Sequence, residues 1–221
     1  MIMADEMSTT VSMMLHGYKN AFVAIEMFAD EKNSSFLGDS EKRPEKIIEI
    51  ARLNECKIKD IINIINMQNK ITLNTEKFSL NELVQNAVSD MRKDNTMDIV
   101  VDSECDSEIT ADRHHLTETL VCILNNAYES FSEMEEDKRI IIKTGRDGRD
   151  VYIQITDNGC GIENTKKIFN AFYSSKMGGK NFGIGLTYAK QIMEAHDGVI
   201  NIKIKLGEGT EVQLLLLNAL K

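Results

Sequence analysis

The chain has 221 residues, of which 42% are hydrophobic, and a formal net charge of -9. This apolar content is sufficient for a folded core, and the acidic balance excludes the clustered Lys and Arg surface that nucleic-acid binding requires. The four cysteines are far apart with no C-x-x-C pair, so we expect neither a zinc site nor a disulfide framework.

The apolar stretches are shorter than the roughly 20 residues that cross a bilayer, and the acidic N-terminus is no signal peptide. We therefore expect a cytoplasmic chain, either by itself or as the cytosolic portion of a longer membrane protein.

The first 70 residues predict two long helices. Apolar residues from Met7 to Phe28 recur at alternating spacings of four and three, which is a coiled-coil seam and predicts a helix over about 4–32. Turn-forming residues over 33–40 and Pro44 precede a second predicted helix over 45–69. Its isoleucine stripe is too wide for two helices to bury, so we expect a homodimer that forms a four-helix bundle.

After Leu73 the pattern changes to mixed α/β. Two hairpins are expected, one with its loop at 145–148 and one with its loop at 207–209. The other expected elements are helices over Phe78–Lys93, Asp112–Phe131 and Thr187–Ala195 and a strand over Asp98–Asp102. We therefore predict an α+β chain with a helical hairpin over 1–73 and an α/β domain over 76–221.

The segment Asp157-Asn158-Gly159-Cys160-Gly161 directly follows an alternating strand. A carboxylate at a strand end can accept a hydrogen bond from the exocyclic amine of adenine, and glycines let the backbone approach a flat ring. For this motif alone, an ordinary Asp-Asn-Gly turn remains the alternative.

A second glycine pair, Gly183 and Gly185, precedes Leu186 and the helix predicted from Thr187. Backbone N–H groups and the positive end of the helix dipole can face a phosphate at such a helix start. The glycine-rich segment before it predicts a lid over the phosphates, with Lys176 as their charge partner. A simple loop-to-helix turn is the alternative.

Asn125 and Asn126 fall inside a predicted helix, although asparagine disfavours helix interiors. A side-chain carbonyl that holds Mg²⁺ on nucleotide phosphates would explain Asn126. A capped or kinked helix is the alternative.

In this order, the motifs resemble the nucleotide-binding fold shared by histidine kinases, DNA gyrase, mismatch-repair ATPases and heat-shock chaperones. Asn126 matches the N box, Asp157–Gly161 the first glycine box, Phe169–Phe172 the F box, Gly183–Leu186 the second glycine box and 207–210 the last glycine turn. The resemblance implies ATP and Mg²⁺ and a mixed sheet packed against three helices. The nucleotide site that it implies includes Asn126, Glu129, Asp157, Gly159, Gly161, Lys176, Gly183, Gly185, Leu186 and Thr210.

The segment His16-Gly17-Tyr18-Lys19-Asn20 is similar to the H box of sensor histidine kinases. Because Met14 and Tyr18 lie on the seam, His16 is expected on the outward face of its helix. The resemblance implies that ATP phosphorylates His16, that His16 passes the phosphoryl group to an aspartate of a response regulator, and that Asn20 positions water for dephosphorylation of that partner. A surface histidine without a role is the alternative.

The segment Phe172–Lys176 and Glu129 further resemble the nitrogen-regulator and sporulation kinase branch. Gly17 stands where the family carries a carboxylate that takes the imidazole proton, and Cys122 where it often has a second polar residue. These departures leave open an ATP-binding regulator with weak or no autokinase activity that acts as a scaffold or phosphatase. An ATPase clamp would need glutamate at position 122, and a serine-directed anti-sigma kinase would lack the N-terminal hairpin.

Overall fold

The computed structural model describes residues 71–92, 98–103, 106–131, 137–162, 167–170 and 183–220. These residues lie in one compact unit. The helices predicted over 4–32 and 45–69, and with them His16 and Asn20, lie outside the described residues, as does Lys176. The homodimer and the domain boundary near residue 74 therefore stay predictions. None of the helices in the described ranges has the length and apolar content of a membrane span.

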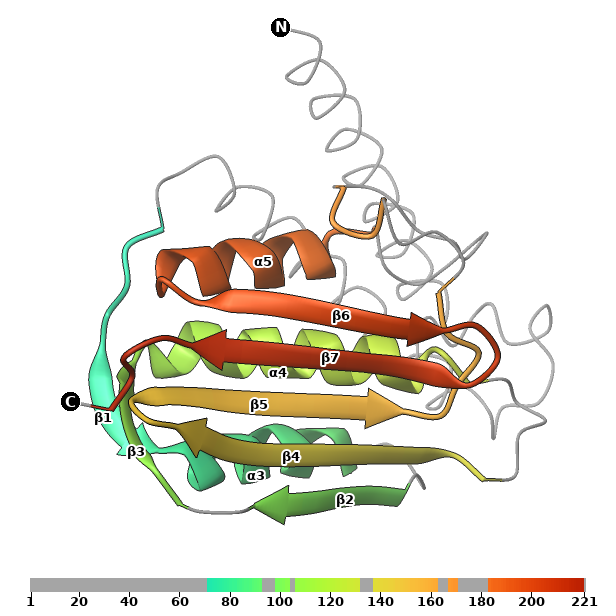
Figure 1. Ribbon diagram of the computed structural model, residues 1–221, viewed down its shortest axis with the longest axis horizontal. Coiled ribbons are helices and arrows are strands. Elements are labelled where there is room, and N and C mark those ends of the chain that lie inside the picture. The colour runs from blue at the N-terminus through green and yellow to red at the C-terminus, as the bar shows by residue number, and fades with distance from the viewer. Residues whose placement is uncertain are drawn as a thin grey trace, which may run out of the picture. The chain divides into compact units, whose positions relative to one another are not determined.

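A five-stranded mixed sheet with the strand order β2-β4-β5-β7-β6 organises this unit (Figure 1). Its strands are β2 (Asp98–Ser103), β4 (Arg139–Asp147), β5 (Asp150–Asp157), β6 (Val199–Lys205) and β7 (Gly209–Leu216). β2 runs parallel to β4, whereas the other neighbours are antiparallel. A parallel pair needs a crossover, and the chain between β2 and β4 contains the longest of the described helices, α4 (Arg113–Tyr128).

Three helices cover one face of the sheet, behind it in the view of Figure 1. They are α3 (Leu80–Arg92), α4 (Arg113–Tyr128) and α5 (Gly185–Ala195). Burial alternates without interruption along β5, because every second side chain points towards the helices. For the described residues, the predicted α+β arrangement of a mixed sheet against three helices is confirmed.

Helix α4 packs between α3 and α5 and carries the centre of the core. Its buried apolar residues are those that the 3.6-residue period predicts, namely Leu116, Leu120, Ile123, Leu124 and Ala127. Full burial of a leucine or isoleucine contributes about 1.5–3 kcal/mol. The core therefore fixes the rotation of α4, and with it the direction in which the polar residues of its last turns point.

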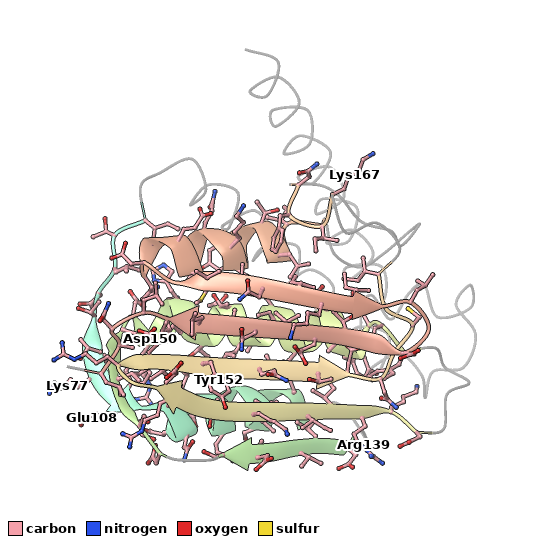
Figure 2. All side chains as sticks on the ribbon, viewed as in Figure 1. Lys77, Glu108, Arg139, Asp150, Tyr152 and Lys167 are labelled. Atoms are coloured by element: carbon pink, nitrogen blue, oxygen red, sulfur yellow. The ribbon has the colours of Figure 1, made fainter. Side chains whose placement is uncertain are left out.

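A second, two-stranded sheet was not expected from the sequence. β1 (Glu76–Ser79) pairs antiparallel with β3 (Glu108–Ala111), so Phe78 lies in a strand rather than in the predicted helix. The helix begins later because the Ser79 hydroxyl accepts a hydrogen bond from the backbone N–H of Glu82. Figure 2 labels Lys77 and Glu108, whose exposed side chains form an ion pair of 3.8 Å across this sheet.

The loop of the first hairpin also differs from the prediction. β4 continues to Asp147, and the turn is Gly148-Arg149, with Gly148 at φ +60°. Gly145 belongs to the strand, where the ring of Tyr152 occupies the space that a side chain at 145 would need. Figure 2 shows Tyr152 on the sheet face turned away from the helices. Gly145 thus serves cross-strand packing and not a turn.

His196 connects the end of α5 to the start of α4. Its Nε2 accepts a hydrogen bond from the backbone N–H of Asp112 at 3.0 Å, and its Nδ1 lies 2.8 Å from the carbonyl oxygen of Ile192. Both contacts are satisfied only by the neutral ring, with the proton on Nδ1. Burial lowers the pKa of His196, and this outweighs the opposite effects of the Ile192 carbonyl and the Asp112 carboxylate.

We expect His196 to make stability depend on pH near neutrality. Because its folded-state pKa lies below the ordinary value of 6.5, the unfolded chain binds more protons between the two values. The contribution of His196 to the free energy of unfolding is therefore complete above about pH 6.5 and declines as the pH falls towards the folded pKa. Denaturant unfolding at pH 7.5 and 5.5 should show a smaller decline in the His196→Gln chain than in the wild type. Equal declines would contradict this role.

Candidate functional site

Asp157 is the last residue of β5, and its side chain points to the helix side of the sheet with 6% exposure. Its Oδ1 accepts hydrogen bonds from the backbone N–H of Gly159 at 3.0 Å and of Thr210 at 3.3 Å. Oδ1 also lies 3.1 Å from the hydroxyl oxygen of Ser130, which donates to it. Donors from three segments thus fix the orientation of this carboxylate.

Two glycines allow these segments to approach Asp157. A Cβ at Gly159 would collide with the Ser130 side chain, and a Cβ at Gly209, where φ is +117°, would collide with the backbone oxygen of Asp157. The last glycine turn is further joined to the first glycine loop by the N–H of Gly207, which donates to the Cys160 carbonyl at 2.9 Å. The sequence predicted both glycine motifs, and the structure places them around one carboxylate.

Asn126 lies in the last turn of α4, and its amide Nδ2 donates to the Sγ of Cys122 at 3.8 Å. Because the two ends of an amide point apart, Oδ1 is directed away from the thiol. The start of α5 lies against this part of α4: a Cβ at Gly185 would collide with Cys122 Sγ and lie 4.0 Å from Asn126 Nδ2. The predicted N box and second glycine box are therefore neighbours.

We expect Gly185→Ala to destabilise the fold through Cys122. The added methyl meets the Cys122 sulfur, and overpacking of this kind costs about 1–3 kcal/mol. The Tm of thermal unfolding should therefore fall by several degrees, at about 2–4 °C per kcal/mol for a unit of this size. The double variant Gly185→Ala/Cys122→Ala should recover most of the loss, with Cys122→Ala alone as the control. A double variant no more stable than Gly185→Ala would show that the collision is not the cause.

Among the described residues, no side chain caps the start of α5. Its N-cap, Ile184, provides no side-chain hydrogen bond, and Gly183 before it has φ +70°. The first N–H groups of a helix need an external partner, and a phosphate is well suited to that position. In the first turn, the Thr187 hydroxyl donates to the carbonyl of Phe169 at 3.0 Å, which connects the predicted F box to α5.

These groups fit a Mg²⁺-bound adenine nucleotide in their chemistry. The Asp157 carboxylate can accept from the adenine amine, the start of α5 can bind phosphate, and Asn126 Oδ1 is an oxygen ligand of the kind that Mg²⁺ takes. Glu129, the C-cap of α4, follows Asn126 by three residues. Gly161, at φ +72°, lies in the loop after β5.

The predicted residues thus form two clusters. One joins Asp157, Gly159 and Thr210, and the other joins Asn126 and Gly185. Gly161, Gly183, Leu186 and Glu129 lie in the expected segments beside them. Sequence reasoning missed Ser130, which contacts Asp157. The available signal was its spacing of four residues, about one helical turn, from Asn126.

Residues 111–219 match the family model described as histidine kinase-, DNA gyrase B- and HSP90-like ATPase. This part of the chain belongs to that ATPase family. The matched range begins at the last residue of β3 and includes both residue clusters. The candidate site therefore lies within the ATPase domain. The motifs follow one another there in the order that the sequence predicted.

Curated relatives of the ATPase domain are named as sensor proteins and histidine kinases. Sensor protein RprX of Bacteroides fragilis is 36% identical over 114 residues, which cover 49% of this chain and 22% of the relative. Signal transduction histidine-protein kinase AtoS of Escherichia coli is 38% identical over 120 residues, which cover 52% of this chain and 19% of the relative. The matches span about a fifth of the length of these relatives.

Solved structures of histidine kinases share the fold. Histidine kinase ThkA in complex with response regulator protein TrrA aligns with a TM-score of 0.68 and 22% identity, over 96% of this chain and 60% of that chain. Full-length ShkA in complex with AMPPNP aligns with a TM-score of 0.64 and 19% identity, over 80% and 40% of the two chains. At these identities the likeness establishes the fold of the ATPase domain and not its ligands.

Proposed function

We propose that the chain is the catalytic core of a sensor histidine kinase, which binds Mg-ATP, phosphorylates His16 and transfers the phosphoryl group to an aspartate of a response regulator. The observation that carries the proposal is the convergence of Gly159, Thr210 and Ser130 on the Asp157 carboxylate within a domain of the ATPase family. The names of the curated relatives support the kinase branch of that family.

Binding uses the two residue clusters for different parts of the nucleotide. Asp157 accepts a hydrogen bond from the adenine amine, while the glycines near it allow the base to approach the backbone. The start of α5 binds phosphate oxygens, and Lys176 pairs with their charge. Asn126 holds Mg²⁺ through its side-chain oxygen; when bound, the ion neutralises charge on the phosphates.

Phosphorylation then requires mainly positioning. A ring nitrogen of His16 attacks the γ-phosphorus, the bond to the β–γ bridging oxygen breaks, ADP departs, and the imidazole releases its proton. Because Gly17 supplies no carboxylate beside His16, another base or the solvent takes that proton. The aspartate of the response regulator next attacks the phosphohistidine, and the P–N bond breaks. Asn20 positions water for the later hydrolysis of the phosphoaspartate.

The proposed partners follow from the hairpin. Residues 1–73 form the homodimer and present His16 to the response regulator, and the stimulus arrives from a sensor region, such as a membrane-bound one. The solved ThkA complex, which contains a response regulator, supports a partner of this class. The proposal places the chain in the cytoplasm, where ATP and response regulators occur.

An ATP-binding regulator with weak or no autokinase activity is the second candidate. The specific observations in its favour are Gly17 and the contact of Asn126 with a thiol instead of a stronger polar group. Incubation of the chain with γ-labelled ATP separates the two functions, since the kinase acquires acid-labile, base-stable label. A chain that binds ATP but acquires no label is the regulator, and one that binds no ATP is neither.

A further inference from the structure

Ser130 joins the end of α4 to the loop that follows β5. It comes directly after Glu129, the C-cap of α4. Its carbonyl accepts a hydrogen bond from the N–H of Cys160 at 3.1 Å, and its hydroxyl donates to Asp157 Oδ1 at 3.1 Å. The main chain and the side chain of one residue therefore both contact the first glycine loop.

The position of the Ser130 hydroxyl is fixed from two sides. Its oxygen lies 2.7 Å from the carbonyl oxygen of Ala127 in the preceding turn, so one hydroxyl proton is shared between a helix carbonyl and the Asp157 carboxylate. Space for the hydroxyl exists because residue 159 is glycine. A Cβ at this position would collide with Ser130. The loop and the helix end are thus complementary in shape at this contact.

Ser130 contributes the side-chain donor among the three groups that bind Asp157 Oδ1, the other two being backbone N–H groups. Hydrogen bonds to a charged acceptor are shorter and stronger than those between neutral groups. Removal of the hydroxyl leaves the backbone N–H groups of Gly159, on the loop, and of Thr210, on β7, bonded to Oδ1. The carboxylate then loses a donor that relates its orientation to the end of α4.

We propose that Ser130 is a positioning residue for base recognition. It orients the Asp157 carboxylate so that the carboxylate accepts from the 6-amino group of adenine and disfavours guanine, which presents an acceptor oxygen at that position. The inference rests on the proposed nucleotide-binding function and adds a determinant of base specificity to it.

A simpler role for Ser130 is to terminate α4. Serine hydroxyls often bond to helix carbonyls, and a purely structural serine would affect every nucleotide alike. The two roles differ in one measurable respect: a residue that acts through Asp157 on the 6-amino group has no effect on a purine that lacks this group. The test therefore compares two nucleotides that differ in that amine.

The experiment measures by calorimetry, for the full chain with Mg²⁺, the affinity for ADP and for purine riboside 5′-diphosphate. We expect Ser130→Ala to weaken ADP binding about tenfold, as befits one hydrogen bond to a charged acceptor, and to change the binding of the diphosphate without the amine less than about twofold. Thr117→Ala is the matched control, because the Thr117 hydroxyl donates to the Arg113 carbonyl at 2.8 Å within the same helix. It should leave both affinities unchanged.

The possible failures are distinguishable. Equal loss for both nucleotides, or no loss for ADP, overturns the role of Ser130 and leaves the proposed function intact, provided that the wild type binds ADP. A wild-type chain that binds neither nucleotide overturns the proposed function and this inference with it. Circular dichroism and thermal unfolding of Ser130→Ala identify a folding defect, which would lower both affinities together and so count against the inference.

Discussion

The Asp157→Asn chain should bind ADP at least about a hundredfold more weakly than the wild type. The amide keeps one acceptor oxygen for the three groups that donate to Oδ1, so its NH₂ group faces the adenine amine, which is also a donor. Loss of the charge-assisted hydrogen bond to the adenine amine and the resulting unsatisfied buried donors together exceed about 3 kcal/mol, and each 1.4 kcal/mol is tenfold in affinity. Calorimetry with Mg²⁺ and ADP measures the change.

Asp150→Asn is the matched control for this experiment. Asp150 begins the same strand, and its carboxylate accepts the N–H of Asn218 at 2.9 Å at the far end of β5, where Figure 2 labels it. The same chemical change there should leave ADP affinity within about twofold, since Asp150 lies at the opposite end of β5 from Asp157. An Asp157→Asn chain with nearly wild-type affinity would remove Asp157 from the site.

Replacement of His16 by glutamine should abolish acid-labile phosphate while ATP binding persists. Glutamine keeps a polar side chain of similar length but has no ring nitrogen that can form a P–N bond, so we expect label to fall at least about a hundredfold. The assay combines γ-labelled ATP incubation with acid and base treatment, and calorimetry confirms binding. His114→Gln, at an exposed position of α4, is the control and should label normally. Label that survives His16→Gln would exclude His16 as the acceptor.

Together these two replacements separate binding from chemistry. Asp157→Asn should lose nucleotide affinity and label together, whereas His16→Gln should lose only label. A chain in which both replacements leave label intact would carry a phosphorylated residue unrelated to this site.

Regular periodicity explains which parts of the fold were predictable. Helix α4 repeats apolar residues over four turns, so its buried face follows from spacing alone. β5 alternates over its whole length and precedes a glycine motif, which located Asp157 at a strand end. In both cases the pattern is local in sequence and long enough to distinguish the helical period of 3.6 residues from the strand period of two.

The remaining differences arise from contacts between distant residues. β1 and β3 are four residues each and pair across about thirty positions, too short for periodicity and too remote for turn signals. Gly145 indicated a turn because a glycine between apolar runs commonly does. Its actual reason is Tyr152 on the next strand, a partner that depends on the pairing register.

In the site, too, the residue types were predictable and their contacts were not. The sequence predicted that Gly159 lets a flat ligand approach the backbone, and the structure adds that the Ser130 side chain occupies the space of a Cβ at this position. Cys122 was identified as a departure from the family pattern, but its proximity to Gly185 depends on how α4 packs on α5. Spacing in the sequence can identify residues with suitable chemistry. Which of these residues contact one another depends on how the helices and strands pack.

The register of the central strand has a consequence for how this domain can vary. Asp157 is paired with Thr210 on β7, and β5 is bonded on its other side to β4. Side chains alternate between the two faces of a strand, so insertion or deletion of one residue within β5 would turn the carboxylate to the opposite side of the sheet. A change of length inside β5 is therefore incompatible with the function of the site.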